Sequence, residues 1–206
     1  MRVRHKPYAG PELAAWAYHI NHPEQQKNNW KISYDNPANP MHIELGCGKG
    51  GFLGALALRN PGINYLGVDI KNEMLVVAKH TIEELFQQQP ITNVRITNYN
   101  IEHISNLLAP EDNVQRIYIN FCNPWYKSGH AKHRLTHPRQ LVAYRDFLAD
   151  DGEIYFKTDD DLLFDKTQEY IYYSGYKVEW LTRDLHATEP SWNIRTEHEQ
   201  MFSAKG

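Results

Sequence analysis

The sequence predicts an α/β fold: a doubly wound, mainly parallel sheet of seven strands with helices on both faces. A short alternating apolar segment over residues 41–45 leads into a glycine-rich turn and then into an amphipathic stretch that starts at Phe52. Strand-like and helix-like patterns then alternate through the chain without an internal repeat, which is typical of a parallel sheet with crossover helices. Polar residues follow several strand-like segments, and parallel sheets bind ligands at those strand ends.

Local patterning and breaker residues place the expected elements. Strands are expected over residues 41–45, 65–69, 93–97, 116–121 and 153–157, with two closing strands over 176–181 and 199–203. Helices are expected from residue 52, over residues 75–86 before Pro90, around residues 141–148, and over residues 162–174 before Gly175. Asp151 and Gly152 predict a turn into the fifth strand. We expect one domain over residues 1–206, with residues 1–40 as an N-terminal extension.

The composition is that of a soluble globular protein. The chain has 206 residues, of which 41% are hydrophobic and 23% charged, so it is long enough to bury a core. No apolar run approaches the ~20 residues of a membrane span, and no apolar signal core follows the basic residues 1–7. The only cysteines are Cys47 and Cys122, which suggests a reducing compartment. We therefore expect a cytoplasmic protein that does not enter a membrane.

The glycine turn after the first strand predicts a nucleoside-cofactor site. Its glycines let the backbone approach a ligand at a helix N-terminus, and they are Gly46, Gly48, Gly50 and Gly51. Asp69 ends the next strand, where it can accept hydrogen bonds from ribose hydroxyls. The spacing fits a nicotinamide dinucleotide. It also fits S-adenosylmethionine (SAM), which Glu44 favours because a carboxylate suits the ammonium and sulfonium charges of SAM. The residues alone leave both cofactors open, as well as a turn that binds nothing.

Two basic segments stand out in a chain whose net charge is −3. The first is residues 2–6. The second is residues 127–139, which combine lysines and arginines with His130, His133 and His137, directly after Trp125 and Tyr126. Cations that contact phosphate, beside aromatic rings that stack on unpaired bases, are typical of RNA binding. A solvated basic loop is the alternative. A metal site is not expected, because no cysteine or carboxylate joins these histidines at ligand spacing.

Several further segments carry a specific resemblance. They are Arg2 to Lys6, Ile117 to Lys127 with its run Asn123, Pro124 and Trp125, Phe156 to Asp159, Asp184 to His186, and Thr196 to Glu199. In these segments the chain resembles the bacterial tRNA (guanine-N7)-methyltransferase family, collinearly from residue 1 to residue 206. The resemblance implies a class I SAM-dependent methyltransferase that modifies N7 of a guanine in the variable loop of tRNA. It implies SAM as the cofactor and tRNA as the partner, with no metal, and it leaves a homodimer open.

The resemblance also implies a role for each matching position. The residues expected to hold SAM are Glu44, Gly46, Gly48, Gly50, Asp69 and, at the adenine end, Asn100. Asn123 is expected to touch SAM beside the transferred methyl group and is the catalytic candidate. The residues expected to bind the substrate are Lys127, His130, Arg134, Asp159, Thr196, Glu197, His198 and Glu199.

The chain departs from the family pattern at some of these positions. The family usually has aspartate where this chain has Asn100 and Asn123, and arginine where it has Gly129 and His133. Guanine N7 carries a lone pair and no proton, so its methylation needs alignment and no general base. A carboxylate at position 123 would stabilise the charge that moves to the purine, whereas an amide lacks that charge. Two alternatives stay open: a tRNA- or SAM-binding paralogue with weakened catalysis, and methylation of an exocyclic amine.

Overall fold

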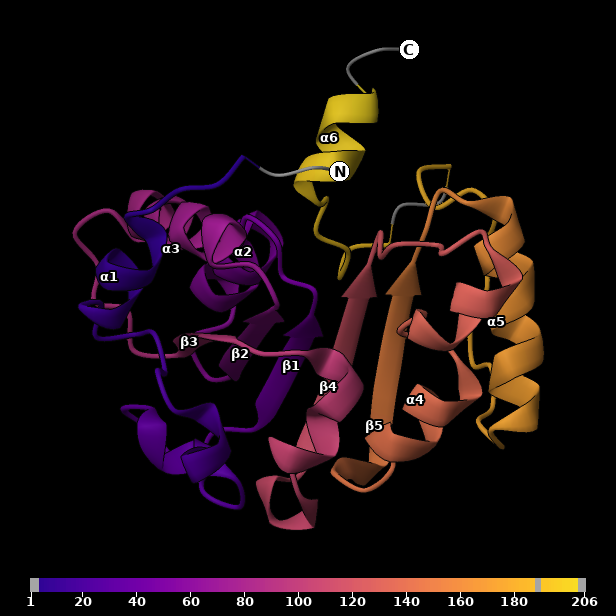
Figure 1. Ribbon diagram of the computed structural model, residues 1–206, viewed down its shortest axis with the longest axis horizontal. Helices are drawn as coiled ribbons and strands as arrows, with labels where there is room; N and C mark the ends of the chain where they lie inside the picture. Colours follow the sequence, from indigo (N-terminus) through magenta and orange to yellow (C-terminus); the bar gives the residue numbers. More distant parts are fainter. Residues whose placement is uncertain (1–3, 188–189, 204–206) are drawn as a thin grey trace.

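The computed structural model describes residues 4–187 and 190–203 and contains one five-stranded parallel sheet (Figure 1). The helices and strands are α1 (Ala9–Ala14), β1 (Met41–Leu45), α2 (Gly51–Arg59), β2 (Asn64–Asp69), α3 (Asn72–Phe86), β3 (Val94–Asn98), β4 (Val114–Asn120), α4 (Pro138–Tyr144), β5 (Leu148–Lys157), α5 (Asp161–Tyr173) and α6 (Glu197–Ser203). Short 3-10 helices lie at η1 (Pro23–Gln26), η2 (Trp30–Ser33), η3 (Ile101–Asn106), η4 (Pro110–Asp112) and η5 (Ser128–His133).

The strand order β3-β2-β1-β4-β5 is that of a doubly wound sheet. Every neighbouring pair is parallel, so all five carboxyl ends lie at one edge. The order reverses at β1, which pairs with β2 on one side and with β4 on the other. Ligands of such sheets bind beside this reversal. The fold therefore places the glycine turn after β1 and the loop after β4 next to each other.

Helices cover both faces of the sheet, as the sequence predicts. One buried cluster joins α1, α2 and α3 to the sheet through side chains such as Leu13, Leu53 and Leu75. The other joins η3 and α4 to the opposite face, with Ile43, Ile104 and Leu141 in its centre. The alternation within β1 explains the division, because successive side chains of a strand point to opposite faces. None of the helices in the described parts of the chain combines the length and apolar character that a membrane crossing requires.

The residues before β1 pack against the sheet. The Ile20 N–H donates to the Ile96 carbonyl at 2.9 Å, and the Ile96 N–H donates to the Tyr18 carbonyl at 3.0 Å. This short parallel bridge covers the outer edge of β3. Further along, Trp30 is fully buried, and its indole N–H donates to the Leu107 carbonyl at 2.8 Å. The side chains of this segment therefore enter the same core as the helices of the sheet.

The prediction of seven strands was wrong, because the described residues form five. The segment 176–181 is irregular and joins no sheet. Its first residue is tied to neighbouring helices, since the Tyr176 hydroxyl donates to the Leu141 carbonyl at 2.9 Å. The segment 199–203 belongs to helix α6. The expected helix at 141–148 ends at Tyr144, and Leu148 already starts β5. Asp151 and Gly152 lie inside β5, where its register against β4 shifts.

Trp30 offers a test of the packing before β1. Replacing Trp30 with Ala should lower the free energy of unfolding by about 3–5 kcal/mol, because a fully buried ring and its hydrogen bond are lost. Urea unfolding followed by circular dichroism measures the change. Ile32→Ala is the matched control, since Ile32 is 70% exposed, and it should change stability by less than about 0.5 kcal/mol. Equal effects of the two substitutions would contradict the packing described.

Candidate active site

The glycine turn after β1 has the left-handed geometry that its sequence requires. Gly46, Gly48 and Gly50 have φ angles of 83°, 54° and 77°, a region that glycine enters at little cost. The turn folds back on β2, since the Gly46 N–H donates to the Val68 carbonyl at 2.8 Å. A β-carbon on Gly50 would lie 2.8 Å from that of Ala78, so α2 approaches α3 too closely for a side chain there. The turn is thus fixed before any ligand binds.

Asp69 at the end of β2 holds the turn in place. Its Oδ2 accepts the Gly48 N–H at 3.1 Å, and its Oδ1 accepts the Lys71 N–H at 2.9 Å. Burial raises the pKa of the Asp69 carboxyl, and these two backbone donors oppose the rise. Each carboxylate oxygen keeps a lone pair for a further donor. Asp69 can therefore support the turn and accept hydrogen bonds from ribose hydroxyls at the same time.

Glu44 is a buried acid with an unmet hydrogen-bonding demand. Its Oε1 accepts the Asn120 amide N–H at 3.0 Å, while its Oε2 has no partner among the described residues. Asn120 Oδ1 is also buried and unpaired. Burial raises the pKa of the Glu44 carboxyl to about 8. Buried polar atoms are normally satisfied, so a ligand with N–H donors and positive charge fits here, as the ammonium end of SAM would.

Asn100, the other expected cofactor residue, follows β3. Its side-chain oxygen accepts the Glu102 N–H at 3.1 Å and caps η3. This contact fixes the direction of the chain as it leaves the sheet. Asn100 lies at the same carboxyl edge as Glu44 and Asp69, so the structure brings the expected cofactor residues to one end of the sheet.

The loop after β4 is strained around Asn123. Phe121 and Trp125 have φ angles of 48° and 47°, which large side chains rarely adopt. Between them, the Asn123 side-chain oxygen accepts the Trp125 N–H at 3.0 Å and tightens the loop. Arg134 braces it from below, since its guanidinium donates to the Pro124 carbonyl at 2.7 Å and to the Trp125 carbonyl at 3.2 Å. Strain of this kind persists only where the surrounding structure enforces it.

Arg134 is therefore placed differently from Lys127 and His130, the expected substrate residues of the same basic segment. It is buried, and its remaining guanidinium nitrogen donates to the Tyr170 hydroxyl at 2.9 Å. Lys127 and His130 are exposed, with the His130 ring 5.7 Å from that of Trp125. The exposed cations of the second basic segment are thus Lys127, Lys132 and Arg139. In the first basic segment, Arg2 lies outside the described residues.

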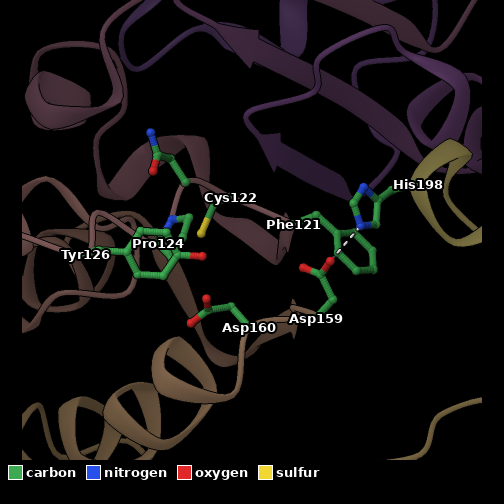
Figure 2. Close-up of a pocket in the computed structure, with 8 residues that line it drawn as sticks. Phe121, Cys122, Pro124, Tyr126, Asp159, Asp160 and His198 are labelled. Atoms are coloured by element: carbon green, nitrogen blue, oxygen red, sulfur yellow. Dashed lines mark hydrogen bonds and ion pairs between the residues drawn. The ribbon is translucent and has the colours of Figure 1, made fainter. Parts of the chain in front are cut away.

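A cavity of about 390 Å³ opens between the loop after β4 and the end of β5 (Figure 2). Its lining residues are Phe121, Cys122, Asn123, Pro124, Tyr126, Asp159, Asp160 and His198. The expected substrate residues Asp159 and His198 meet here, with His198 Nε2 2.9 Å from Asp159 Oδ2. Burial raises the pKa of the Cys122 thiol to about 12, so it is not a nucleophile at neutral pH. The cavity thus offers aromatic faces and carboxylates, which suit a flat base with N–H donors.

The segment Thr196–Glu199 begins helix α6 with a capping box. The Glu199 N–H donates to the Thr196 hydroxyl at 3.1 Å, and the Thr196 N–H donates to Glu199 Oε2 at 2.8 Å. Both side chains are buried. Burial opposes ionisation of Glu199, but the Thr196 N–H and the Lys157 ammonium together hold its pKa below the usual range. Glu197 lies against the glycine turn, since a β-carbon on Gly51 would be 2.7 Å from Glu197 Oε1.

Lys157 is a site residue that the sequence placed near a strand end without giving it a role. Its ammonium at the end of β5 donates to Asn193 Oδ1 at 2.6 Å, to the Ile194 carbonyl at 3.0 Å and to Glu199 Oε2 at 3.1 Å. It therefore fastens the segment that leads into α6 to the sheet. The run from Phe156 to Asp159 was recognised, but only its aspartate received a role. A lysine at the end of an apolar run of the expected strand 153–157 was the available signal.

The fold and these two adjoining sites define the class I methyltransferase architecture. The solved "Structure of an antibiotic related Methyltransferase" aligns with a TM-score of 0.51 at 18% identity, covering 68% of this chain and 70% of that one. The precorrin-6y C5,15-methyltransferase of Geobacter metallireducens also aligns with a TM-score of 0.51, at 16% identity, covering 68% and 66%. Residues 38–206 match the family described as "Putative methyltransferase".

Sequence relatives give the particular family. A tRNA (guanine-N(7)-)-methyltransferase of Clostridium perfringens (strain SM101 / Type A) is 48% identical over 208 residues, which span 100% of this chain and 95% of that protein. One of Ruminiclostridium cellulolyticum is 48% identical over 209 residues, which span 100% and 88%. This chain belongs to the tRNA (guanine-N7)-methyltransferase family. Across residues 4–187 and 190–203, no three histidine, cysteine or acidic side chains gather as metal ligands.

The raised pKa of Glu44 predicts a pH-dependent stability. The unfolded carboxyl ionises near its ordinary pKa of 4.5, while the folded one stays protonated to about pH 8. Native stability should therefore fall as the pH rises from 5 to 8, by at most about 1.4 kcal/mol per pH unit. Glu44→Gln removes this loss, so the stability of the variant relative to the native protein should increase toward pH 8. Urea unfolding without SAM at pH 5, 6, 7 and 8 measures the difference, and parallel curves would contradict the assignment.

Proposed function

We propose that this protein transfers the methyl group of SAM to N7 of a guanine in tRNA, and that the guanine lies in the variable loop. One feature carries the proposal: the Glu44–Asn120 hydrogen bond joins the glycine-turn site to the strand whose loop forms the cavity. A cofactor held at the turn and a base held in the cavity would then meet near Asn123. Membership of the family supports the same substrate and the same cofactor.

On the cofactor side, each residue has a distinct task. SAM supplies an activated methyl group on a sulfonium. Glu44 binds the ammonium through its unpaired Oε2, and the resulting ion pair lowers the pKa of the carboxyl. Asp69 accepts the ribose hydroxyls, and Asn100 borders the adenine. The turn of Gly46, Gly48 and Gly50 lets these groups approach the backbone.

On the base side, the protein aligns the guanine with the methyl group and excludes water. Guanine N7 attacks through its in-plane lone pair, so no residue has to remove a proton, and alignment supplies most of the rate gain. Asp159 accepts hydrogen bonds from guanine N1–H and the exocyclic amine. Asn123 lies beside the transferred methyl group and orients the base through its amide. As the purine gains positive charge, the acids of the cavity stabilise it.

The tRNA backbone lies along the exposed cations of the second basic segment, Lys127, Lys132 and Arg139. Trp125 and His130 lie next to them and provide aromatic faces for an unpaired nucleotide. Arg134 acts indirectly by holding the loop. We infer that the reaction takes place in the cytoplasm, where tRNA is found.

The amide side chain of Asn123 favours two alternative functions over methylation at N7. An amide at the reacting position suits methylation of an exocyclic amine, because its carbonyl can accept the hydrogen bond of an N–H. It also suits a relative that binds tRNA and SAM with weakened catalysis. Incubation with labelled SAM and bulk tRNA, followed by nucleoside mapping, separates all three functions. We expect 7-methylguanine in the variable loop, and its absence from a tRNA whose variable-loop guanines are replaced by adenine. A labelled exocyclic amine, or no label, would overturn the proposal.

Asn123→Asp should speed methylation. The substitution adds a carboxylate beside the acceptor at nearly constant volume. Because Asn123 is exposed in the free protein, solvent weakens the effect, and we expect a gain of about 1–2 kcal/mol, or 5- to 30-fold in single-turnover rate. Asn29→Asp adds the same charge at an exposed position outside the cavity and should leave the rate unchanged. An Asn123→Asp rate at or below the native one, with SAM binding intact, would favour the alternatives.

The basic segment predicts a salt dependence. Replacing both Lys127 and Lys132 with Gln should flatten the plot of log affinity for tRNA against log salt by about one unit per lost phosphate contact. Lys177→Gln serves as control, because Lys177 is an exposed cation outside this segment whose partner is Glu179. If the double variant and the control have the same slope as the native protein, the segment is a solvated loop.

A further inference from the structure

Phe121 turns its ring out of the sheet at the mouth of the cavity. It follows β4 directly, and its N–H donates to the Lys157 carbonyl at 2.9 Å, which continues the pairing with β5 by one bond. Its φ angle of 48° then bends the chain away from the strand. A bulky residue in this region is a strained exception that points to a functional constraint. The strained backbone places an aromatic face in the cavity.

That aromatic face is covered by His198. The two rings stack with centroids 4.3 Å apart and planes 29° from parallel. His198 Nε2 also lies 2.9 Å from Asp159 Oδ2 (Figure 2). The imidazole is thus a flat nitrogen heterocycle that lies on an aromatic ring and pairs with a carboxylate at its edge. A guanine would need the same two contacts, a stacking face and an acceptor for its N–H groups.

We propose that Phe121 is the stacking platform for the target guanine, and that His198 occupies this platform in the free protein until the base displaces it. The inference rests on the proposed function and adds two roles to it. Phe121 becomes a base-binding residue, a role that the sequence analysis did not give it. His198 becomes a placeholder that keeps the aromatic face and the Asp159 carboxylate covered between turnovers.

The displacement requires little rearrangement. Helix α6 is held by the capping box of Thr196 and Glu199 and by the Lys157 ammonium, none of which involves the imidazole. Rotation of the His198 side chain therefore uncovers Phe121 while the helix stays in place. Side-chain rotation is much faster than typical turnover, so the placeholder weakens base binding without limiting the rate of catalysis.

The platform also suits the charge of the reaction. Methylation at N7 leaves a positive charge on the purine, and an aromatic face attracts a cation that lies over it. Phe121 should therefore hold 7-methylguanine more tightly than guanine. In a chain whose position 123 is an amide, this face adds to the Asp159 carboxylate in stabilising the cationic base.

Nucleotide binding tests both roles. Guanosine monophosphate and its 7-methyl derivative are titrated into the native protein, His198→Ala, Phe121→Leu and the double variant, each saturated with the demethylated cofactor. His198→Ala should bind both nucleotides about 3- to 10-fold more tightly, because the competing contacts are gone. Phe121→Leu should weaken the 7-methyl nucleotide about 5- to 20-fold and the unmethylated one less. The gain from His198→Ala should disappear in the double variant.

Matched variants separate the possible outcomes. Phe121→Tyr keeps the ring and should bind like the native protein, so a loss in both Phe121 variants would assign the defect to the strained backbone and overturn the platform. Gln200→Ala removes an exposed side chain of the same helix and should change nothing. Unchanged or weaker binding in His198→Ala would overturn the placeholder. Methylation of tRNA by the native protein is measured in parallel, so failure of the proposed function shows separately.

Discussion

Both walls of the candidate cavity depend on Lys157. Its carbonyl accepts the Phe121 N–H and fixes the loop that carries Asn123. Its ammonium, nearly buried, holds Asn193, Ile194 and Glu199 and so positions the start of α6. The ammonium also lies 5.4 Å from the centre of the Phe52 ring, at the first turn of α2. A single residue at the end of β5 thus connects α2, the loop that carries Asn123 and the helix that carries His198.

Local sequence patterns were sufficient for the central part of the fold. The alternation in β1, the glycine turn and the acid at Asp69 are all short-range signals, and the structure has each of them where the sequence placed it. The strands predicted over residues 176–181 and 199–203 are absent for a physical reason. A strand exists only with a hydrogen-bonding neighbour, and no local pattern reports whether one is present. Thr196 and Glu199 have the spacing of a capping box, which indicates the start of a helix. The weak alternation of apolar residues over 199–203 led instead to the prediction of a strand.

The candidate site was predictable in its residue types and less so in its contacts. Asp159 and His198 were both named, yet their pairing with each other could not be read from positions so far apart in the chain. Arg134 looked like a cation for phosphate, whereas its guanidinium supports the Asn123 loop from inside. Phe121 lies inside the recognised segment from Ile117 to Lys127 but received no role, since its left-handed backbone angle cannot be read from the sequence. Sequence reports which groups are available, and tertiary contacts decide which of them face the ligand.

The two halves of the site differ in the attachments that hold them. The glycine turn after β1 is held by Asp69 at the end of the neighbouring strand β2, 21 positions away in the chain. The cavity half needs β4, β5 and a segment near residue 198, with Lys157 and Glu199 joined across 42 positions. Local openings of a protein start where such distant attachments are few. A partial opening that frees α6 would leave the glycine turn intact, so the proposed base site would be lost while the proposed cofactor site persists.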